Sequence, residues 1–151
     1  MKAKITGTGS CLPEKIITND ELSKMVDTSD EWIKERTGIR QRRVSDADTA
    51  TSDLALCAAK KALEAAKLDP SKLDFILVAT CTPDTLFPSV STILQDKLGA
   101  KNAAALDVSA ACSGFNFALA TASSFIESGM YKNILVVGAD TLAKYLGYLH
   151  L

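Results

Sequence analysis

The sequence is poor in the residues that build metal, membrane and nucleic-acid sites. It has one histidine, His150, and its four cysteines form no CxxC pair, so the common zinc-ligand spacings are absent and we expect no metal. Apolar runs are too short and interrupted to span a bilayer, and Met1 to Gly9 lacks a signal peptide's apolar core. The formal net charge of −1 provides no global field for nucleic acid or an anionic membrane. These absences predict a cytoplasmic protein without nucleic-acid or membrane partners.

What remains is a composition typical of a globular enzyme or binding protein. Hydrophobic residues make up 47% of the 151 residues and charged residues 23%, which fits one domain with one core. We find no repeat, no low-complexity linker and no domain boundary. In a reducing cytosol all four cysteines are expected as free thiols, with Cys11, Cys57 and Cys81 as small buried hydrophobes.

Apolar runs of strand length alternate with amphipathic stretches of helix length. Capping residues mark several helix ends: Asn19 and Ser29 as N-caps, and Gly38 as a terminator. The alternation predicts an α/β fold with a mostly parallel sheet and helices on both faces. The predicted strands are 3–10, 39–44, 75–80, 103–109 and 133–139, and the predicted helices are 20–26, 30–37, 51–67, 89–98 and 112–128. The tail from 140 to 151 has no clear assignment.

Cys112 lies between a predicted strand and a predicted helix, in a turn of small residues. Unpaired N–H groups and the macrodipole at a helix N-terminus favour an anion, and therefore the thiolate form of a cysteine there. The small neighbours leave room for a substrate. A buried structural cysteine in a tightly packed junction explains the position equally well.

The helix that follows Cys112 is apolar around most of its circumference. Glu127 is its only charged residue, and a helix of this kind is buried on most faces. One sheet covers one face only, so the sequence predicts a further covering element.

Four motifs in order resemble β-ketoacyl-acyl-carrier-protein synthase III, the condensing enzyme that starts type II fatty acid synthesis. They are Ile5–Ser10 with Leu12–Pro13, Asp27–Ile33, Arg36–Ile39 and Ala110–Phe115. The resemblance implies a thiolase-type fold of two similar halves, each built on a five-stranded mixed sheet. Residues 1–151 would form the N-terminal thiolase-like domain, incomplete at its last strand, with the second half absent.

The chemistry implied by this resemblance is a Claisen condensation in two stages. Cys112 takes an acyl group, typically acetyl, from an acyl-coenzyme A, and decarboxylated malonyl-acyl-carrier protein then attacks the acyl-enzyme. The implied protein is a cytoplasmic homodimer that uses a coenzyme A thioester as substrate and needs no cofactor. The family's catalytic histidine and asparagine lie in the second half, and His150 is not that histidine. The isolated chain is therefore expected to be inactive, and the alternative is a non-enzymatic module that dimerises or binds acyl groups.

Trp32 and Arg36 are the implied coenzyme A residues. Four positions apart on a helix, they share a face, and an indole and a guanidinium can sandwich a flat heterocycle. The family uses this pair for the adenine, with a threonine at the position of Thr28 bonding nearby. A chance contact on an exposed helix is the alternative.

Two further positions carry expectations from the resemblance. An aromatic residue at Phe87 would reach across the dimer to the partner's acyl pocket, although a core plug at a helix start fits equally. Leu142 would line the acyl pocket. The basic run Arg40, Arg42 and Arg43 would contact coenzyme A phosphates or the carrier protein, or form a solvated edge.

A flavodoxin-like nucleotide-binding protein would show the same alternation of strands and helices. It requires a phosphate-binding loop, and Gly7-Thr8-Gly9 lacks the third glycine and the helix start of the dinucleotide fingerprint. The sequence therefore disfavours this fold.

Overall fold

The structure, a computed structural model, describes residues 2–144 and divides into two compact units. Unit 1 comprises Met1–Cys11 and Ala50–Asp140, and unit 2 comprises Leu12–Thr49 and Thr141–Leu151. Unit 1 contains α3 (Thr51–Ala66), β3 (Phe75–Ala79), α4 (Val90–Leu98), β4 (Ala104–Val108), α5 (Gly114–Glu127) and β5 (Ile134–Gly138), with short 3₁₀ turns at Pro70–Lys72 and Ala111–Ser113. Unit 2 contains β1 (Ile16–Thr18), α1 (Asn19–Leu22), α2 (Asp30–Thr37), β2 (Gln41–Arg43) and a 3₁₀ turn at Leu142–Lys144.

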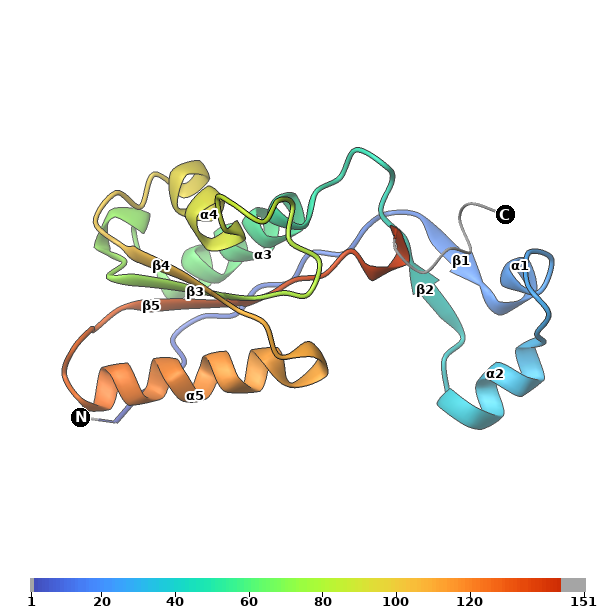
Figure 1. Ribbon diagram of the computed structural model, residues 1–151. Helices are drawn as coiled ribbons and strands as arrows, with labels where there is room; N and C mark the ends of the chain where they lie inside the picture. Colours follow the sequence, from blue (N-terminus) through green and yellow to red (C-terminus); the bar gives the residue numbers. More distant parts are fainter. Residues whose placement is uncertain (1, 145–151) are drawn as a thin grey trace. The chain divides into compact units, whose positions relative to one another are not determined.

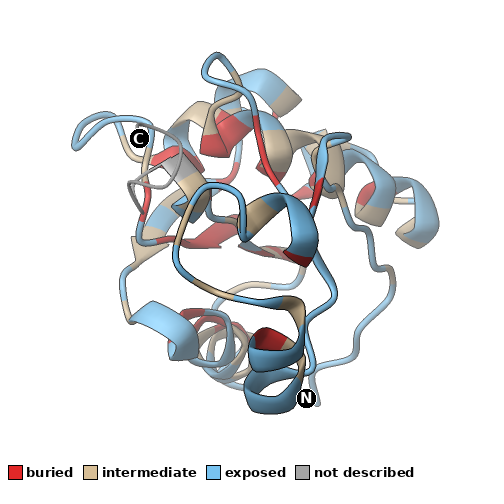
Figure 2. Ribbon diagram, turned by 90° about the vertical axis from the view of Figure 1, so that its right-hand side faces the viewer, coloured by how far each residue is buried: buried red, intermediate tan, exposed pale blue. Residues whose placement is uncertain are grey.

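Unit 1 is built on a three-stranded parallel sheet in the order β4-β3-β5. In the central strand Leu77 aligns with Leu106 on one side and Val136 on the other. Every residue of β3 is buried, as predicted for an apolar strand covered on both faces. Figure 2 shows the buried positions concentrated on this sheet and the helix faces against it.

Helices cover both faces of this sheet, which confirms the predicted architecture (Figure 1). Ile76 and Val78 of β3 pack in a cluster with α3, α4 and β5, whereas Phe75, Leu77 and Ala79 pack against α5. The alternation follows from the two-residue period of a strand. In the described residues, 2–144, no helix is both long and apolar enough to cross a membrane.

The predicted strand at residues 3–10 is wrong. The segment pairs with no strand of the described chain and instead runs along α3, with Gly7 facing Ala62 and Gly9 facing Ala58 so closely that a Cβ at either glycine would collide with the helix backbone. Its alternation of small residues therefore reflects close approach to a helix rather than sheet pairing.

Two cysteine expectations are also wrong. Cys11, at the end of this segment, forms a disulfide with Cys57 of α3, and Cys81 is exposed instead of buried. The cysteine spacings carried no signal of the pair, because the two residues are 46 positions apart and meet only when the segment lies along the helix.

Unit 2 combines a two-stranded antiparallel sheet with two short helices. β1 pairs with β2, which confirms an extended piece within 39–44, while β1 was not predicted. Helix α2 has the predicted bounds, with Ser29 as N-cap and Gly38 in the left-handed region at φ +73°. The predicted helix 20–26 is shorter and begins earlier, because Thr18 caps it through a capping box with Glu21.

The division into two units has no marker in the sequence. The chain passes from unit 1 into unit 2 after Cys11 and back into unit 1 at Ala50, and neither crossing has a linker of distinctive composition. That residues 1–151 form one thiolase-like domain stays a prediction.

Candidate functional site

The carboxyl ends of the three parallel strands meet at one edge of the sheet in unit 1. The segments after β3, β4 and β5 therefore all begin there, at Thr80, Ser109 and Ala139. In sheets of this kind ligands bind outside the carboxyl ends of the strands. Cys112 follows β4 at this edge, where the sequence placed it.

Cys112 lies in the short 3₁₀ turn Ala111–Ser113, directly before α5. The helix therefore begins at Gly114, two residues later than predicted. Cys112 is a free thiol and exposed, which rules out the buried structural cysteine. The residue before it, Ala111, has φ +45°, a backbone conformation that a non-glycine residue rarely adopts. Such a conformation turns the chain sharply between strand and helix and is often found at functional sites.

Small residues let α5 start close to the sheet. A Cβ added at Gly114 would lie 3.2 Å from Ala79 Cβ, so this helix start tolerates little more than a glycine. The next residue, Phe115, packs its ring against Gly138 at the end of β5, where an added Cβ would lie 3.1 Å from Phe115 Cδ2. The turn that carries Cys112 is thereby fixed to both neighbouring strand ends.

Asp140 ties the segment after β3 to the end of β5. Its Oδ1 accepts hydrogen bonds from the N–H groups of Cys81 (2.7 Å) and Thr82 (3.2 Å) and from the hydroxyls of Thr80 (3.2 Å) and Thr82 (3.0 Å). A carboxylate with several donors holds a loop more firmly than a neutral acceptor.

Two more carboxylates hold helix N-termini against the sheet. Asp107 in β4 accepts from the N–H groups of Val90 (2.9 Å) and Ser91 (2.8 Å), the start of α4. Asp84 accepts from the N–H group of Ser52 (2.9 Å), the start of α3. Sequence analysis missed all three aspartates. Asp107 lies within a predicted strand and Asp140 directly after one, which is itself a signal of such a role, whereas Asp84 has no such signal.

Phe87 lies in the segment after β3, and its side chain is 90% exposed. This exposure contradicts the core plug. Leu142 lies in unit 2, in the last 3₁₀ turn, and is 49% exposed. Their roles at an acyl pocket stay predictions, and His150 lies outside the described residues.

Helix α5 buries one face and exposes the other. Gly114, Ala118 and Ala122, four residues apart, face the sheet, whereas Phe117 is 58% exposed. The expectation that a further element covers this helix stays a prediction. A cavity of about 870 Å³ lies between α5, α3, β5 and the segment 3–9, and Leu119 and Ile126 are among its apolar lining residues.

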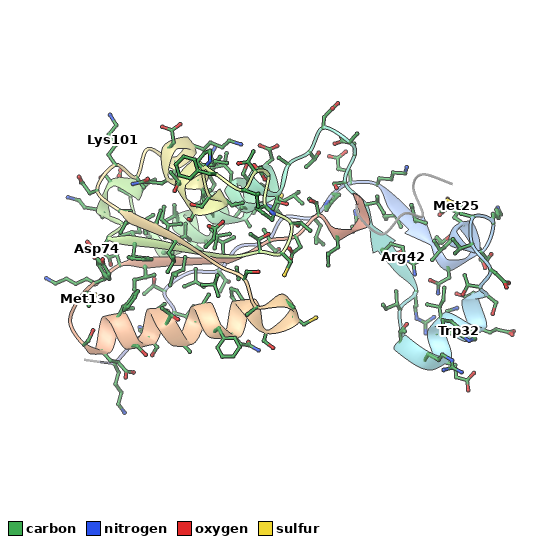
Figure 3. All side chains as sticks on the ribbon, in the orientation of Figure 1. Met25, Trp32, Arg42, Asp74, Lys101 and Met130 are labelled. Carbon is green, nitrogen blue, oxygen red and sulfur yellow. A yellow bond between two sulfur atoms is a disulfide. The ribbon has the colours of Figure 1, made fainter. Side chains whose placement is uncertain are left out.

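Unit 2 brings Trp32 and Arg36 together on α2. Figure 3 shows Trp32 on this helix. The Arg36 guanidinium carbon lies 5.0 Å from the centre of the Trp32 ring, and Trp32 is 54% exposed. This geometry is a cation–π contact with an accessible indole. Thr28, just before α2, has a buried hydroxyl with no hydrogen-bond partner among the described residues, so this hydroxyl can still donate and accept a hydrogen bond.

Two of the three side chains in the arginine run make hydrogen bonds within unit 2. Arg42 donates to Asn19 Oδ1 (2.9 Å), and Arg43 donates to the carbonyls of Pro13 and Glu14 (both 3.2 Å). Arg40 is exposed. Two of the three side chains therefore stabilise the unit, and a contact of this run with phosphates or a carrier protein stays a prediction.

Comparison with known proteins gives a consistent family. Residues 106–149 match the family model for 3-oxoacyl-[acyl-carrier-protein] synthase III. The chain is 60% identical over 146 residues to the β-ketoacyl-[acyl-carrier-protein] synthase III of Caldanaerobacter subterraneus subsp. tengcongensis, covering 97% of this chain and 44% of the relative. The corresponding enzyme of Geobacillus kaustophilus is 58% identical, with 95% and 46% covered. The chain thus spans less than half the length of these curated relatives.

The structure is similar to the crystal structure of 3-oxoacyl-[acyl-carrier-protein] synthase III from Aquifex aeolicus VF5. The TM-score is 0.91 at 52% sequence identity, and the match covers 93% of this chain and 46% of that one. The match confirms the predicted fold class, a partial thiolase-like α/β fold.

Proposed function

Since this chain belongs to the β-ketoacyl-acyl-carrier-protein synthase III family and matches less than half the length of its relatives, we propose that it carries the nucleophile of the initiating condensation. Cys112 attacks the thioester carbon of an acyl-coenzyme A, probed here as acetyl-coenzyme A. The Cys112 sulfur forms the new thioester bond, the old carbon–sulfur bond breaks, and coenzyme A leaves as the thiol. Malonyl-acyl-carrier protein then loses carbon dioxide, and its carbanion attacks the thioester carbon of the acyl-enzyme. A carbon–carbon bond forms, the carbon–sulfur bond to Cys112 breaks, the Cys112 thiolate is regenerated, and the β-ketoacyl-acyl-carrier protein leaves.

The observation that carries this proposal is the exposed Cys112 thiol at the carboxyl edge of a parallel sheet, directly before a 14-residue helix. Ser113, the N-cap, makes no capping side-chain bond to that helix within the described chain. The N–H groups of Ser113 and Gly114 are bonded to the carbonyls of Ala110 and Ala111. We therefore assign stabilisation of the thiolate to the helix dipole and stabilisation of the thioester oxyanion to the N–H of Cys112 itself.

Coenzyme A recognition is proposed for unit 2. The adenine stacks on the exposed Trp32 indole with Arg36 as the second planar group, and the unpaired Thr28 hydroxyl bonds to the nucleotide. These three residues bind the substrate and take no part in bond breaking.

The remaining assignments follow the family. Phe87 and Leu142 line acyl pockets, and the exposed Phe87 does so in the second subunit of a homodimer. The acyl-carrier protein is the second partner, no cofactor is needed, and the enzyme acts in the cytoplasm. An exposed phenylalanine fits a protein contact, because large apolar side chains gain free energy when a partner covers them.

We also propose that the 151-residue chain by itself accepts an acyl group but does not condense it. Its single histidine is His150, and the family's enolate-stabilising histidine and asparagine lie beyond the matched region. The competing function is a catalytically incompetent module that dimerises or binds acyl groups without bond formation. Acyl transfer to Cys112 separates the two.

The test is intact-protein mass spectrometry of the chain incubated with acetyl-coenzyme A, with peptide mapping of the acetyl group. Cys112→Ser should lose the thioester adduct by about a thousandfold or more, since a neutral hydroxyl is a far weaker nucleophile than a thiolate. Cys81→Ser is the matched control, because Cys81 is the other free, exposed cysteine. An adduct that persists in Cys112→Ser and disappears in Cys81→Ser contradicts the proposal.

A further inference from the structure

Asn19 is the most deeply buried polar residue in the described part of unit 2, with 1% of its surface exposed. Its Nδ2 group donates to Asp30 Oδ1 (2.9 Å) and to the carbonyl oxygen of Ile39 (2.8 Å). Its Oδ1 accepts from Nη2 of Arg42 (2.9 Å). One side chain thus joins α1, both ends of α2 and β2.

Only a short amide matches these three partners. A carboxylate and a carbonyl oxygen accept hydrogen bonds, and a guanidinium only donates, so the position requires two donor hydrogens and one acceptor on a single small group. The partners also fix which end of the amide carries nitrogen. The Asn19 amide thus uses both donor hydrogens and its oxygen, which favours one geometry over its alternatives. In contrast, Nη1 of Arg42 in the same network is buried without a hydrogen-bond partner among the described residues.

The contacts of Asn19 frame α2 at its two ends. Asp30 is the first residue of the helix, and Ile39 follows Gly38, which ends it. Lys34 also bonds to the Asp30 carboxylate at 2.5 Å, one turn further along the same helix. The Asn19 amide therefore contacts α2 at both ends and, together with the buried Ile33, sets the orientation of the face that carries Trp32 and Arg36.

We propose that Asn19 is a positioning residue that holds α2 so that the Trp32–Arg36 pair can receive a flat heterocycle. Its ligand, coenzyme A, rests on the proposed function above, whereas the positioning of α2 does not. The side chain itself touches no substrate.

Trp32 makes the test specific, because it is the only tryptophan in the chain. Its fluorescence anisotropy without ligand reports how firmly α2 is held, and quenching of its emission by added coenzyme A reports binding. Asn19→Leu should lower the anisotropy and weaken coenzyme A binding about tenfold, since three hydrogen bonds are lost in a buried position. Asn19→Asp should behave similarly, because a carboxylate cannot donate and lies against Asp30.

A reciprocal swap tests the direct contact. In the double variant Asn19→Asp with Asp30→Asn, the hydrogen bond between positions 19 and 30 forms in the reverse direction and the contact with Arg42 is kept. This variant should bind coenzyme A at least about threefold more tightly than Asn19→Asp alone. Equal affinities would overturn the inference, even if Asn19→Leu fails to fold.

Ile17→Ala is the control for simple destabilisation, since Ile17 is buried in β1 of the same unit without a part in the amide network. It should lower the melting temperature of the chain yet leave coenzyme A affinity within about twofold. The inference is overturned if Ile17→Ala weakens binding as much as Asn19→Leu, or if Asn19→Leu leaves anisotropy and affinity unchanged. If the unmodified chain does not respond to coenzyme A while Asn19→Leu still lowers the anisotropy, the positioning of α2 stands and the proposed ligand fails.

Discussion

Unit 1 and unit 2 fix their functional groups by different means. Unit 1 places Cys112 at the end of a strand in a sheet that apolar side chains bury on both faces. Unit 2 has a small apolar core, made chiefly of Ile17, Ile33 and Val44, and a buried amide network at Asn19. The nucleophile thus depends on apolar packing, whereas the planar pair on α2 depends on polar contacts. Apolar truncations should therefore cost the most stability in unit 1, and loss of the Asn19 amide should act on ligand binding by unit 2.

The largest effect on stability is expected at Leu77, which is fully buried in the central strand and packs against α5. Leu77→Ala should lower the free energy of unfolding by about 3–4 kcal/mol, through lost burial and the cavity left behind. Leu106→Ala on the neighbouring strand is the matched control, because Leu106 is half exposed and should cost less than about 1.5 kcal/mol. Denaturant unfolding measures both, and equal losses would contradict the packing described here.

The Cys11–Cys57 disulfide joins two residues of unit 1 and closes a loop that contains residues 12–49 of unit 2. Cys57→Ser should lower the free energy of unfolding by about 3 kcal/mol relative to the oxidised chain. Thermal melts with and without a thiol reductant measure the effect, with Cys81→Ser as control. Identical melting of the oxidised and reduced chain would show that the bond contributes no stability.

A smaller effect is expected where a carboxylate supports unit 1. Asp107→Asn keeps the shape of the side chain but removes the charge and replaces an acceptor oxygen with a donor nitrogen. One of the two bonds to the start of α4 is lost, so the free energy of unfolding should fall by about 1–2 kcal/mol. Urea unfolding tests this loss, and a change of less than about 0.3 kcal/mol would mean that packing alone holds α4.

The smallest effect is expected for the stability of unit 2 at low pH. Hydrogen bonds from Lys34 and then from Asn19 hold the pKa of Asp30 below its ordinary value of 3.8. A carboxyl group with a lowered folded-state pKa contributes stability above its unfolded pKa, and this contribution is lost as the pH falls through the folded value. The Trp32 emission should therefore shift below about pH 4, less steeply in Asp30→Asn.

Asp69→Asn is the control for this titration. Asp69 also has a lowered pKa, from hydrogen bonds with Ser71, but it lies in unit 1. It should leave the Trp32 titration unchanged. If Asp30→Asn titrates like the unmodified chain, the Asp30 contacts contribute nothing to the acid response.

The parts of unit 1 with strong periodicity were predictable from the sequence. The three strands of the sheet and the helices between them were found to within a few residues, because apolar period and capping residues agree there. The segment 3–10 failed because its small residues fit a close approach to α3 as well as a strand. Likewise, the two members of the Cys11–Cys57 pair lie far apart in sequence, and local patterns carry no information on such contacts.

The residues proposed for the candidate site could be predicted from the sequence, but the side chains that hold their segments in place could not. Cys112, Trp32 and Arg36 follow from local motifs, and the structure gives them the exposure and the ring contact that these motifs imply. The roles of Asn19 and Asp140 depend on partners 11 to 60 residues away. The sequence predicts Asn19 as a helix cap, because an asparagine before a short helix usually has that role. Here Thr18 is the cap, and the amide points inward.

The most direct test of the two-part account is the rate of acyl transfer from acetyl-coenzyme A to the chain, measured over a range of substrate concentrations. Trp32→Ala should raise the half-saturating concentration about tenfold and leave the maximal rate nearly unchanged, since it removes binding shared by substrate and transition state. Cys112→Ser should abolish transfer at every concentration. Transfer to Cys112→Ser at the normal rate, or a Trp32→Ala curve that superimposes on that of the unmodified chain, would contradict the account.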